Sequence, residues 1–235
     1  MSHSQYDGSR AASGRSATKI RLYSIALAIV LCLQSIWILT PELIRQSLPY
    51  FPTDRTEIND FSEARKANAT AANVAWIRGD LWVDFALAAS APLLNGISNS
   101  ADDTVTADRE IAEHAAALAP YDARVWLLLS GLNFASDSKN TNAVAQLKMS
   151  FYTAPNDIRL IPLRLSLAAR LDSIDDEVQN LIEHDVRTGV RGKPSLNSGI
   201  LAAYNNGSPA GRGFIETKLA EIDPQFLAEL RNSFK

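Results

Sequence analysis

The stretch ALAPYDARVW, residues 117–126, recurs as YTAPNDIRLI at residues 152–161. Both copies contain the pattern Ala-Pro-X-Asp-X-Arg, and their prolines, Pro120 and Pro155, are 35 residues apart. Proline ends a helix because it lacks the amide hydrogen, and an aspartate two residues later can cap the next helix. The pattern therefore predicts two helix–turn–helix junctions of an internal repeat. A third copy, EIDPQFLAEL at 221–230, keeps only the proline after an apolar helix.

The residues around these junctions follow the period of an α-helix. Apolar side chains recur three and four residues apart in several segments, for example at Val144, Leu147 and Phe151, and at Val178, Leu181, Ile182 and Val186. Each set forms one stripe along a helix. The alternation typical of strands is missing from the sequence. We therefore expect an all-α domain over residues 61–235, with the helix hairpin as its unit.

One segment matches a known repeat more fully than the others. Its large and small side chains stand at the positions of that repeat: Trp126, Leu129, Ala143, Leu147, Ser150 and the closing Pro155. Residues 122–155 thereby resemble a tetratricopeptide repeat, whose unit is two antiparallel helices of about 34 residues. Ser130 and Asn133 depart from the pattern, which expects glycine and an aromatic residue there, and the loop 136–140 is one residue longer.

The resemblance implies a short solenoid of antiparallel helix hairpins, with a concave face that binds peptides or protein segments. It extends weakly over 157–189, where Pro162 requires the helix to begin beside it or to kink. Upstream, 72–95 and 105–119 form a candidate earlier pair. Trp126 is expected to pack between the helices of the central hairpin. The alternative is an irregular helical bundle with an accidental Pro-Asp echo.

A second feature is the uncharged stretch LYSIALAIVLCLQSIWIL, Leu22–Leu39. A helix of this length spans about 27 Å, close to the roughly 30 Å of a bilayer's hydrocarbon core. Tyr23 and Trp37 lie near its ends, where aromatic rings favour the membrane interface. The small residues of a cleavage site do not follow the apolar run. We therefore expect an uncleaved transmembrane helix over 22–40 that stops at Pro41.

Charge is distributed unevenly about this segment. Residues 1–21 carry four basic side chains against one acidic one, whereas the whole chain has 23 Lys and Arg against 26 Asp and Glu. The positive-inside rule places residues 1–21, expected to be a disordered tail, in the cytoplasm. Residues 41–60, with three prolines, are expected to form a linker, and the domain at 61–235 is expected in the periplasm of a bacterium. The single cysteine, Cys32, excludes an intramolecular disulfide.

Residues with catalytic or metal-binding chemistry are scattered. His114 and His184 have no second histidine or cysteine at ligand spacing. The acidic run 175–177 opens a helix, where negative charge complements the helix dipole. The segment GSPAGRG, 207–213, lacks the Gly-Lys-Ser/Thr of a phosphate loop and is expected to be a flexible loop before a helix near Phe214. We expect no catalytic residue, no metal site and no cofactor.

Together these features indicate a single-pass protein of the bacterial inner membrane, whose domain is a scaffold or adaptor rather than an enzyme. By analogy with repeat modules on such anchors, its protein partner is expected in a secretion, translocon or surface-polysaccharide assembly. Trp76, Trp82, Trp126 and Phe85 form either helix–helix core or an exposed anchor for that partner. The mild acidity offers no electrostatic case for nucleic acid. Two alternatives stay open: an envelope enzyme with an unrecognised carboxylate site, and a secreted soluble helical protein.

Overall fold

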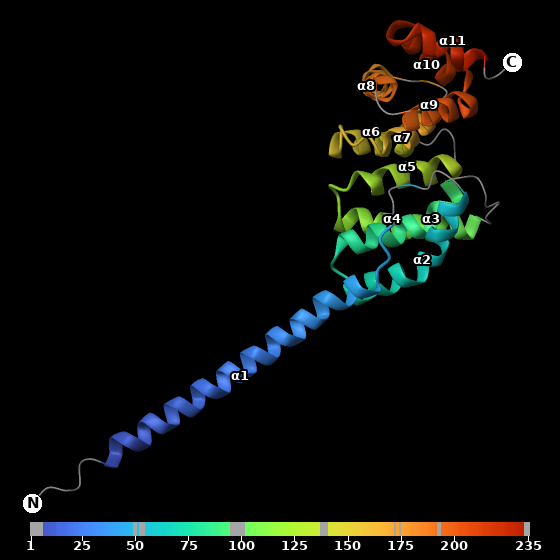
Figure 1. Ribbon diagram of the computed structural model, residues 1–235. Helices are drawn as coiled ribbons and strands as arrows, with labels where there is room; N and C mark the ends of the chain where they lie inside the picture. The colour runs from blue at the N-terminus through green and yellow to red at the C-terminus, as the bar shows by residue number, and fades with distance from the viewer. Residues whose placement is uncertain are drawn as a thin grey trace, which may run out of the picture.

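The computed structural model describes residues 7–48, 51, 55–94, 102–136, 141–171, 173, 175–191 and 194–232. These residues form eleven α-helices and no strand, which confirms the all-α prediction. One long helix, α1 (Asp7–Ile44), projects away from the other helices, which pack into a domain at its C-terminal end (Figure 1).

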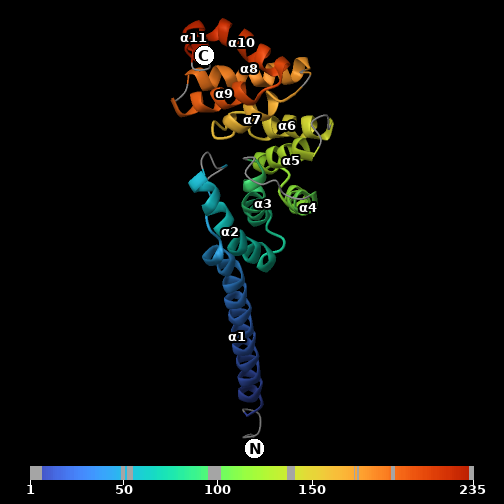
Figure 2. The same cartoon turned by 90° about the vertical axis from the view of Figure 1, so that its right-hand side faces the viewer.

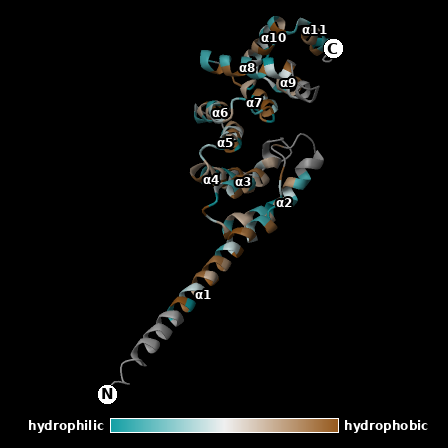
Figure 3. Cartoon of the chain, turned by 60° about the vertical axis from the view of Figure 1, so that its left-hand side comes forward, coloured by the Kyte–Doolittle hydropathy of each residue, from teal (hydrophilic) through white to brown (hydrophobic). Residues whose placement is uncertain are grey.

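The helix α1 has the length and composition of a membrane span. Its segment Lys19–Ile44 is 26 residues long, and none of its most apolar part is buried. Figure 3 shows this apolar band between the N-terminus and the domain. Every side chain from Lys19 to Leu39 is exposed, and a helix that is apolar on all faces requires apolar surroundings. Length and composition therefore permit α1 to cross a bilayer.

The N-terminal boundary of α1 differs from the sequence prediction, which places a disordered tail at residues 1–21. The helix begins at Asp7, so most of that tail is helical. Nucleating a helix is costly, whereas extending one adds a hydrogen bond for each residue fixed. The apolar segment supplies the nucleus, and the alanine, arginine and lysine residues before it favour the extension. Residues 1–6 lie outside the described part of the chain.

The C-terminal boundary also differs, because the sequence predicts a helix stop at Pro41 and a linker over 41–60. α1 instead continues past this proline, and the amide of Arg45 donates to the carbonyl of Pro41 at 2.8 Å. A proline near a helix end removes one hydrogen bond without blocking the turn that follows it. The next helix, α2 (Arg55–Val74), begins earlier than expected, which shortens the connection to 45–54.

The next helices stack in chain order. After α2 they are α3 (Gly79–Leu94), α4 (Asp102–Leu118), α5 (Ala123–Ser136), α6 (Thr141–Thr153) and α7 (Ile161–Ala168). Each packs against the next one, and α5 also contacts both α3 and α7 (Figure 2). α5 lies at the centre, with residues 127–134 all buried. It contributes to two apolar clusters, one shared with α2, α3 and α4 and one shared with α6 and the later helices.

Trp126 does not occupy the predicted position between the helices of the α5–α6 hairpin. It is partly buried and packs against the cluster shared with α2, α3 and α4. Leu127 instead belongs to the cluster shared with α6. Consecutive helical residues point about 100° apart, so Leu127 faces α6 while Trp126 faces back along the stack.

Four helices close the domain: α8 (Asp176–Arg191), α9 (Pro194–Asn206), α10 (Pro209–Ile222) and α11 (Pro224–Asn232). The hairpin order changes here, because α7 packs more extensively against α9 than against α8. Gly199 permits this approach, since a Cβ there would lie 2.8 Å from the Cβ of Pro162. Pro162 occupies the first turn of α7, so the helix begins beside it, as the sequence predicts.

The start of α10 corrects the prediction of a flexible loop over 207–213. α10 begins at Pro209, and the Ser208 hydroxyl accepts a hydrogen bond from the amide of Gly211 at 3.0 Å. A serine cap followed by proline favours a helix start. Gly211 serves close packing, because a Cβ there would lie 2.1 Å from the carbonyl oxygen of Ala169.

Candidate interaction surface

Three interhelical turns lie next to one another at one edge of the stack. They join α2 to α3 (75–78), α4 to α5 (119–122) and α6 to α7 (154–160). The first two lie side by side: a Cβ on Gly79, directly after the first turn, would lie 2.9 Å from the Cβ of Ala119 in the second turn and 2.6 Å from the carbonyl oxygen of Leu118 before it. The second and third border the same hollow. We call these three segments the turn row.

The second and third turns, which carry the Pro-Asp echo, contain the same hydrogen bonds. Asp122 Oδ1 accepts from the Arg124 amide at 2.9 Å and from its Nε at 3.0 Å. Asp157 Oδ1 likewise accepts from the Arg159 amide at 3.1 Å and from its Nε at 2.9 Å. The Nη2 atoms reach the second carboxylate oxygens at 2.7 Å and 3.1 Å. The echo is therefore a repeated local structure, in which an arginine clamps the aspartate two residues before it.

The first turn has this arrangement with the charges exchanged. Arg78 and Asp80 stand where the second turn has Asp122 and Arg124, and Arg78 Nη2 lies 2.6 Å from Asp80 Oδ2. Burial opposes ionisation of Asp80, but the hydrogen bond and charge of Arg78 outweigh it and lower the pKa of that carboxyl. An arginine–aspartate pair thus closes all three turns.

Tryptophan residues reinforce the first two turns in the same way. The indole N–H of Trp82 donates to the carbonyl of Trp76 at 3.0 Å, and that of Trp126 donates to the carbonyl of Pro120 at 2.7 Å. Trp82 and Trp126 are partly buried against the apolar clusters, as is Phe85, whereas Trp76 is exposed. Of the aromatic residues that the sequence leaves open between core and surface, Trp76 alone therefore lies on the surface.

Ion pairs connect the turn row to α1. Arg45, directly after α1, lies 3.3 Å from Asp80 Oδ2 and 3.9 Å from Asp84 Oδ2. Asp84 of α3 in turn lies 3.2 Å from Arg124 of α5. Burial raises the pKa of Asp84, and the charges of the two arginines offset this only in part. A line of paired charges thus runs from the end of α1 through α3 to α5.

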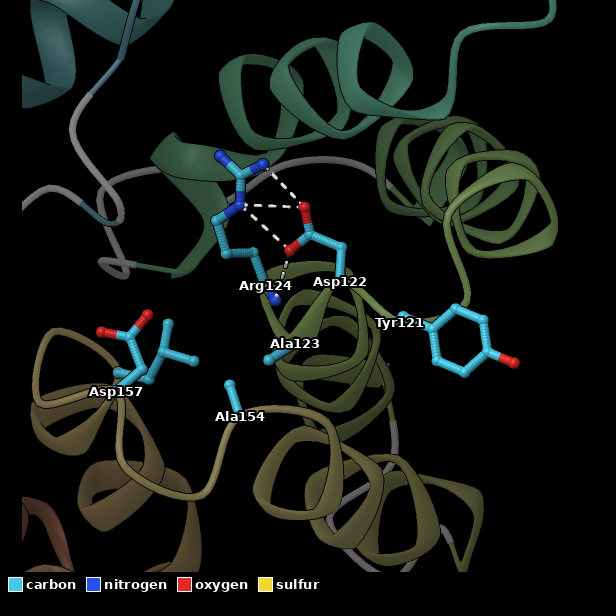
Figure 4. A pocket seen from close by; sticks show the side chains of 7 residues that line it. Tyr121, Asp122, Ala123, Arg124, Ala154 and Asp157 are labelled. Atoms are coloured by element: carbon cyan, nitrogen blue, oxygen red, sulfur yellow. Dashed lines mark hydrogen bonds and ion pairs between the residues drawn. The ribbon is translucent and has the colours of Figure 1, made fainter.

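A hollow of about 340 Å³ separates the second and third turns (Figure 4). Its lining consists of Tyr121, Asp122, Ala123, Arg124, Ala154, Asp157 and Leu160. The short side chains of Ala123 and Ala154 leave the space open, with Asp122 and Arg124 on one side and Asp157 on the other. The ring of Tyr121, which is 88% exposed, points away from the hollow. This volume is near the lower end of the range for ligand pockets, roughly 300–1,000 Å³.

The two histidines of the domain lie outside the three segments of the turn row. His114 packs edge-on against Trp82, with ring centroids 4.3 Å apart, and His184 is exposed on α8. In the part of the chain that the structure describes, no group of three His, Cys, Asp or Glu residues could hold a metal ion.

Asp175 and Glu177 of the acidic run 175–177 make hydrogen bonds and ion pairs within the domain. Asp175 Oδ1 accepts a hydrogen bond from the amide of Val178 at 2.8 Å and so caps α8. Lys148 of α6 lies 2.8 Å from Asp175 and also pairs with Glu177. The run therefore ties α8 to α6, in keeping with a role at the helix terminus.

Sequence reasoning missed Arg164, which is fully buried on α7. Its Nε donates to the Ser150 hydroxyl at 3.1 Å, and its Nη2 donates to the Ala154 carbonyl at 3.0 Å and to the Ser150 carbonyl. The guanidinium also lies 4.6 Å from the ring centroid of Phe151. Arg164 thereby holds the end of α6 against α7.

Asp185 of α8 is the second fully buried charge that sequence reasoning missed. Neither carboxylate oxygen has a hydrogen-bond partner among the described residues. Burial raises the pKa of Asp185 to about 7, while the nearby charge of Arg164 acts in the opposite direction. A sequence signal was present, because Asp185 continues the stripe of Val178 and Ile182 at helical spacing.

No protein-family model matches the sequence, and no curated protein or solved structure matches it significantly.

Proposed function

We propose that this chain is a single-pass membrane protein whose domain binds a segment of a protein partner at the turn row. The observation that carries the proposal is the repeated Asp–Arg clamp on both sides of the hollow, at Asp122–Arg124 and Asp157–Arg159. Because the charges within each turn are already paired, the turns are rigid before a partner binds. Such a preformed surface loses little conformational entropy on binding.

The packing order of α3 to α6 supports a tetratricopeptide-like stack within this domain. Consecutive helices pack as hairpins, and the first helices of neighbouring hairpins, α3 and α5, contact each other. Such stacks expose extended surfaces to their partners. The different order of α7 and α9 restricts the proposed repeat to the part of the domain next to α1.

The hollow supports binding rather than catalysis. Two alanines and Leu160 form its apolar part, and its charged residues, Asp122, Arg124 and Asp157, take part in the clamps. A catalytic site would bring a nucleophile within hydrogen-bonding reach of a base. One or two side chains of a protein segment fit this volume, and its peptide groups can bond to the polar rim.

The charge distribution supports a location in the bacterial inner membrane, with the N-terminus in the cytoplasm and the domain in the periplasm. The four basic residues before the apolar segment of α1 favour this orientation. The domain would then act as a scaffold or adaptor that holds a protein beside an envelope assembly, such as secretion, translocon or surface-polysaccharide machinery.

Site-specific photo-crosslinking in native membranes tests the proposal. The photoreactive amino acid replaces Tyr121 beside the hollow or, as a control, Ala135, which is exposed near the opposite end of α5. We expect a discrete protein adduct from position 121 and none from position 135. Ala154→Leu, which narrows the hollow and leaves the residues of both clamps unchanged, should abolish the adduct.

The matched change Ala135→Leu should leave the adduct at position 121 intact. Equal adducts from both positions, or an adduct that survives Ala154→Leu, would contradict binding at the turn row. Loss of activity in a complementation assay from one folded carboxylate variant that still captures its partner would instead favour an enzyme.

A further inference from the structure

The end of α1 is fixed to the domain by contacts with the first turn of the turn row. The indole N–H of Trp37 donates to the carbonyl of Val74 at 3.0 Å, although the two residues are 37 apart in the chain. Arg78 pairs with Glu42 in the last turn of α1. These contacts hold the first turn at a fixed height along α1.

The first turn therefore lies level with the end of the apolar segment of α1. Trp37 lies where an aromatic residue meets the membrane interface, and Val74 is bonded to it. In the turn that follows, Trp76 and Ile77 are 67% and 53% exposed, and Leu43 in the last turn of α1 is 86% exposed. Figure 2 shows the C-terminal end of α2 beside the end of α1, with the later helices farther away.

The corresponding residues of the other turns are less apolar. Trp76-Ile77 of the first turn corresponds to Pro120-Tyr121 in the second and to Pro155-Asn156 in the third. The local fold does not require a tryptophan at position 76, because only its backbone carbonyl accepts the Trp82 indole. Two large exposed apolar side chains are costly in water and favourable in the interfacial layer of a bilayer. The apolar pair therefore occurs in the turn that α1 holds at the interface.

We propose that Trp76 and Ile77 insert into the interfacial layer of the bilayer that α1 spans, so that the domain has a second contact with the membrane. The inference rests on the proposed span of α1. One helix alone permits a domain to rotate and tilt, whereas two contacts fix its orientation. The turn row then extends outward from the membrane, and the hollow meets its partner at a fixed height above the lipid.

Spin labels on single cysteines in the full chain, reconstituted into phosphatidylcholine vesicles, test this contact. The native Cys32, exposed on α1, reports on the span. In a Cys32→Ala background, Ile77→Cys reports on the first turn, and Tyr121→Cys is the matched control in the second turn. Power-saturation spectra give the accessibility of each label to oxygen, which enters lipid, and to a water-soluble nickel complex. We expect the oxygen-to-nickel ratio to be several-fold higher at position 77 than at position 121.

The possible outcomes separate this inference from the span on which it rests. Equal ratios at positions 77 and 121, with Cys32 in lipid, would overturn the second contact and leave the span intact. A label at Cys32 that is accessible from water would overturn both. The same labels are also measured in native membranes. A label at position 77 that is shielded from both reagents there, but not in the vesicles, would assign this surface to a protein partner and overturn the lipid contact. Circular dichroism checks that both variants, which alter exposed side chains, keep the fold.

Discussion

Arg124 and Arg164 both tie neighbouring helices together, but in opposite surroundings. Arg124 lies at the edge of the stack and pairs with Asp122 and Asp84, within reach of solvent. Arg164 is fully buried, and the nearby Asp185 is buried without a hydrogen-bond partner among the described residues. An ion pair near the surface contributes little to the free energy of folding, because water solvates either charge when the other is removed. A buried charge without its neighbour is strongly destabilising. We therefore expect the removal of an arginine that joins two helices to destabilise the fold less in the half of the domain near α1 than in the C-terminal half.

The largest predicted effect is the loss of the buried arginine. Arg164→Ala should lower the free energy of unfolding by about 3–5 kcal/mol, because it removes the buried hydrogen bonds to Ser150 and Ala154 and the positive charge near the buried Asp185. Arg124→Ala, the matched change at the edge, should cost about 1 kcal/mol. Urea denaturation of the full chain in detergent micelles, followed by tryptophan fluorescence, measures both.

A double variant sharpens the comparison. Arg164→Met combined with Asp185→Leu removes both buried charges, and it should recover the part of the loss in Arg164→Ala that comes from the buried Asp185 charge, but not the part that comes from the hydrogen bonds to α6. Equal losses for the two single arginine variants would show that burial does not distinguish the two halves.

The second effect concerns the close packing of α10 against Ala169, the residue that directly follows α7. Gly211→Ala should cost about 1–3 kcal/mol, because its Cβ would lie 2.1 Å from the Ala169 carbonyl oxygen and the helices must move apart. Gly213→Ala on the same helix meets nothing within 4 Å and should stabilise by up to about 1 kcal/mol through helix propensity. The melting temperatures should therefore change in opposite directions. A shift in the same direction would refute this packing.

The third effect is a pH dependence that belongs mainly to the C-terminal half. Burial raises the pKa of Asp185 to about 7, so the folded chain binds more protons than the unfolded chain between about pH 4 and 7. Stability should fall as pH rises through this window, with a slope that approaches 1.4 kcal/mol per pH unit at most, where about 1.4 kcal/mol corresponds to one pKa unit. Denaturation midpoints at several pH values measure it.

Asp185→Asn is the control for this slope. It should flatten the profile above pH 6 and leave the smaller contribution of Asp108, whose pKa burial raises to about 6 against the charge of Arg65. A profile that Asp185→Asn does not change would assign the pH dependence to another group.

These contrasts also explain which features the sequence could predict. Helices and the turns at Pro120 and Pro155 depend on residues close in the chain, so spacing and capping predict them. The meeting of Arg164 with α6, and of α7 with α9, depends on contacts between distant segments, which periodicity does not encode. Asp185 shows the intermediate case: its place in an apolar stripe was visible, but its burial beside Arg164 was not.

The site was predictable to the same extent. The Pro-Asp-X-Arg echo indicated two equivalent turns, and the structure gives both the same clamp. The sequence pattern does not indicate the first turn, because its charges are exchanged and Arg78-X-Asp80 does not match Asp-X-Arg. The position of this turn beside α1 follows from the bond between Trp37 and Val74, which joins residues 37 apart.

The smallest predicted effect compares the two clamps with each other. Asp122→Ala and Asp157→Ala should each cost about 1 kcal/mol, because each removes a carboxylate that accepts hydrogen bonds within its turn. If the echo is a structural repeat, the two losses should be similar, with a slightly larger loss for Asp122, because Arg124 also pairs with the buried Asp84. Denaturation midpoints of the two variants, measured side by side, check this order. A loss of stability in Asp157→Ala several times larger than that in Asp122→Ala would place the third turn with the C-terminal half, where substitutions are expected to destabilise more. The turn row would then consist of two regions of unequal stability, and the two echo turns would not be equivalent repeats.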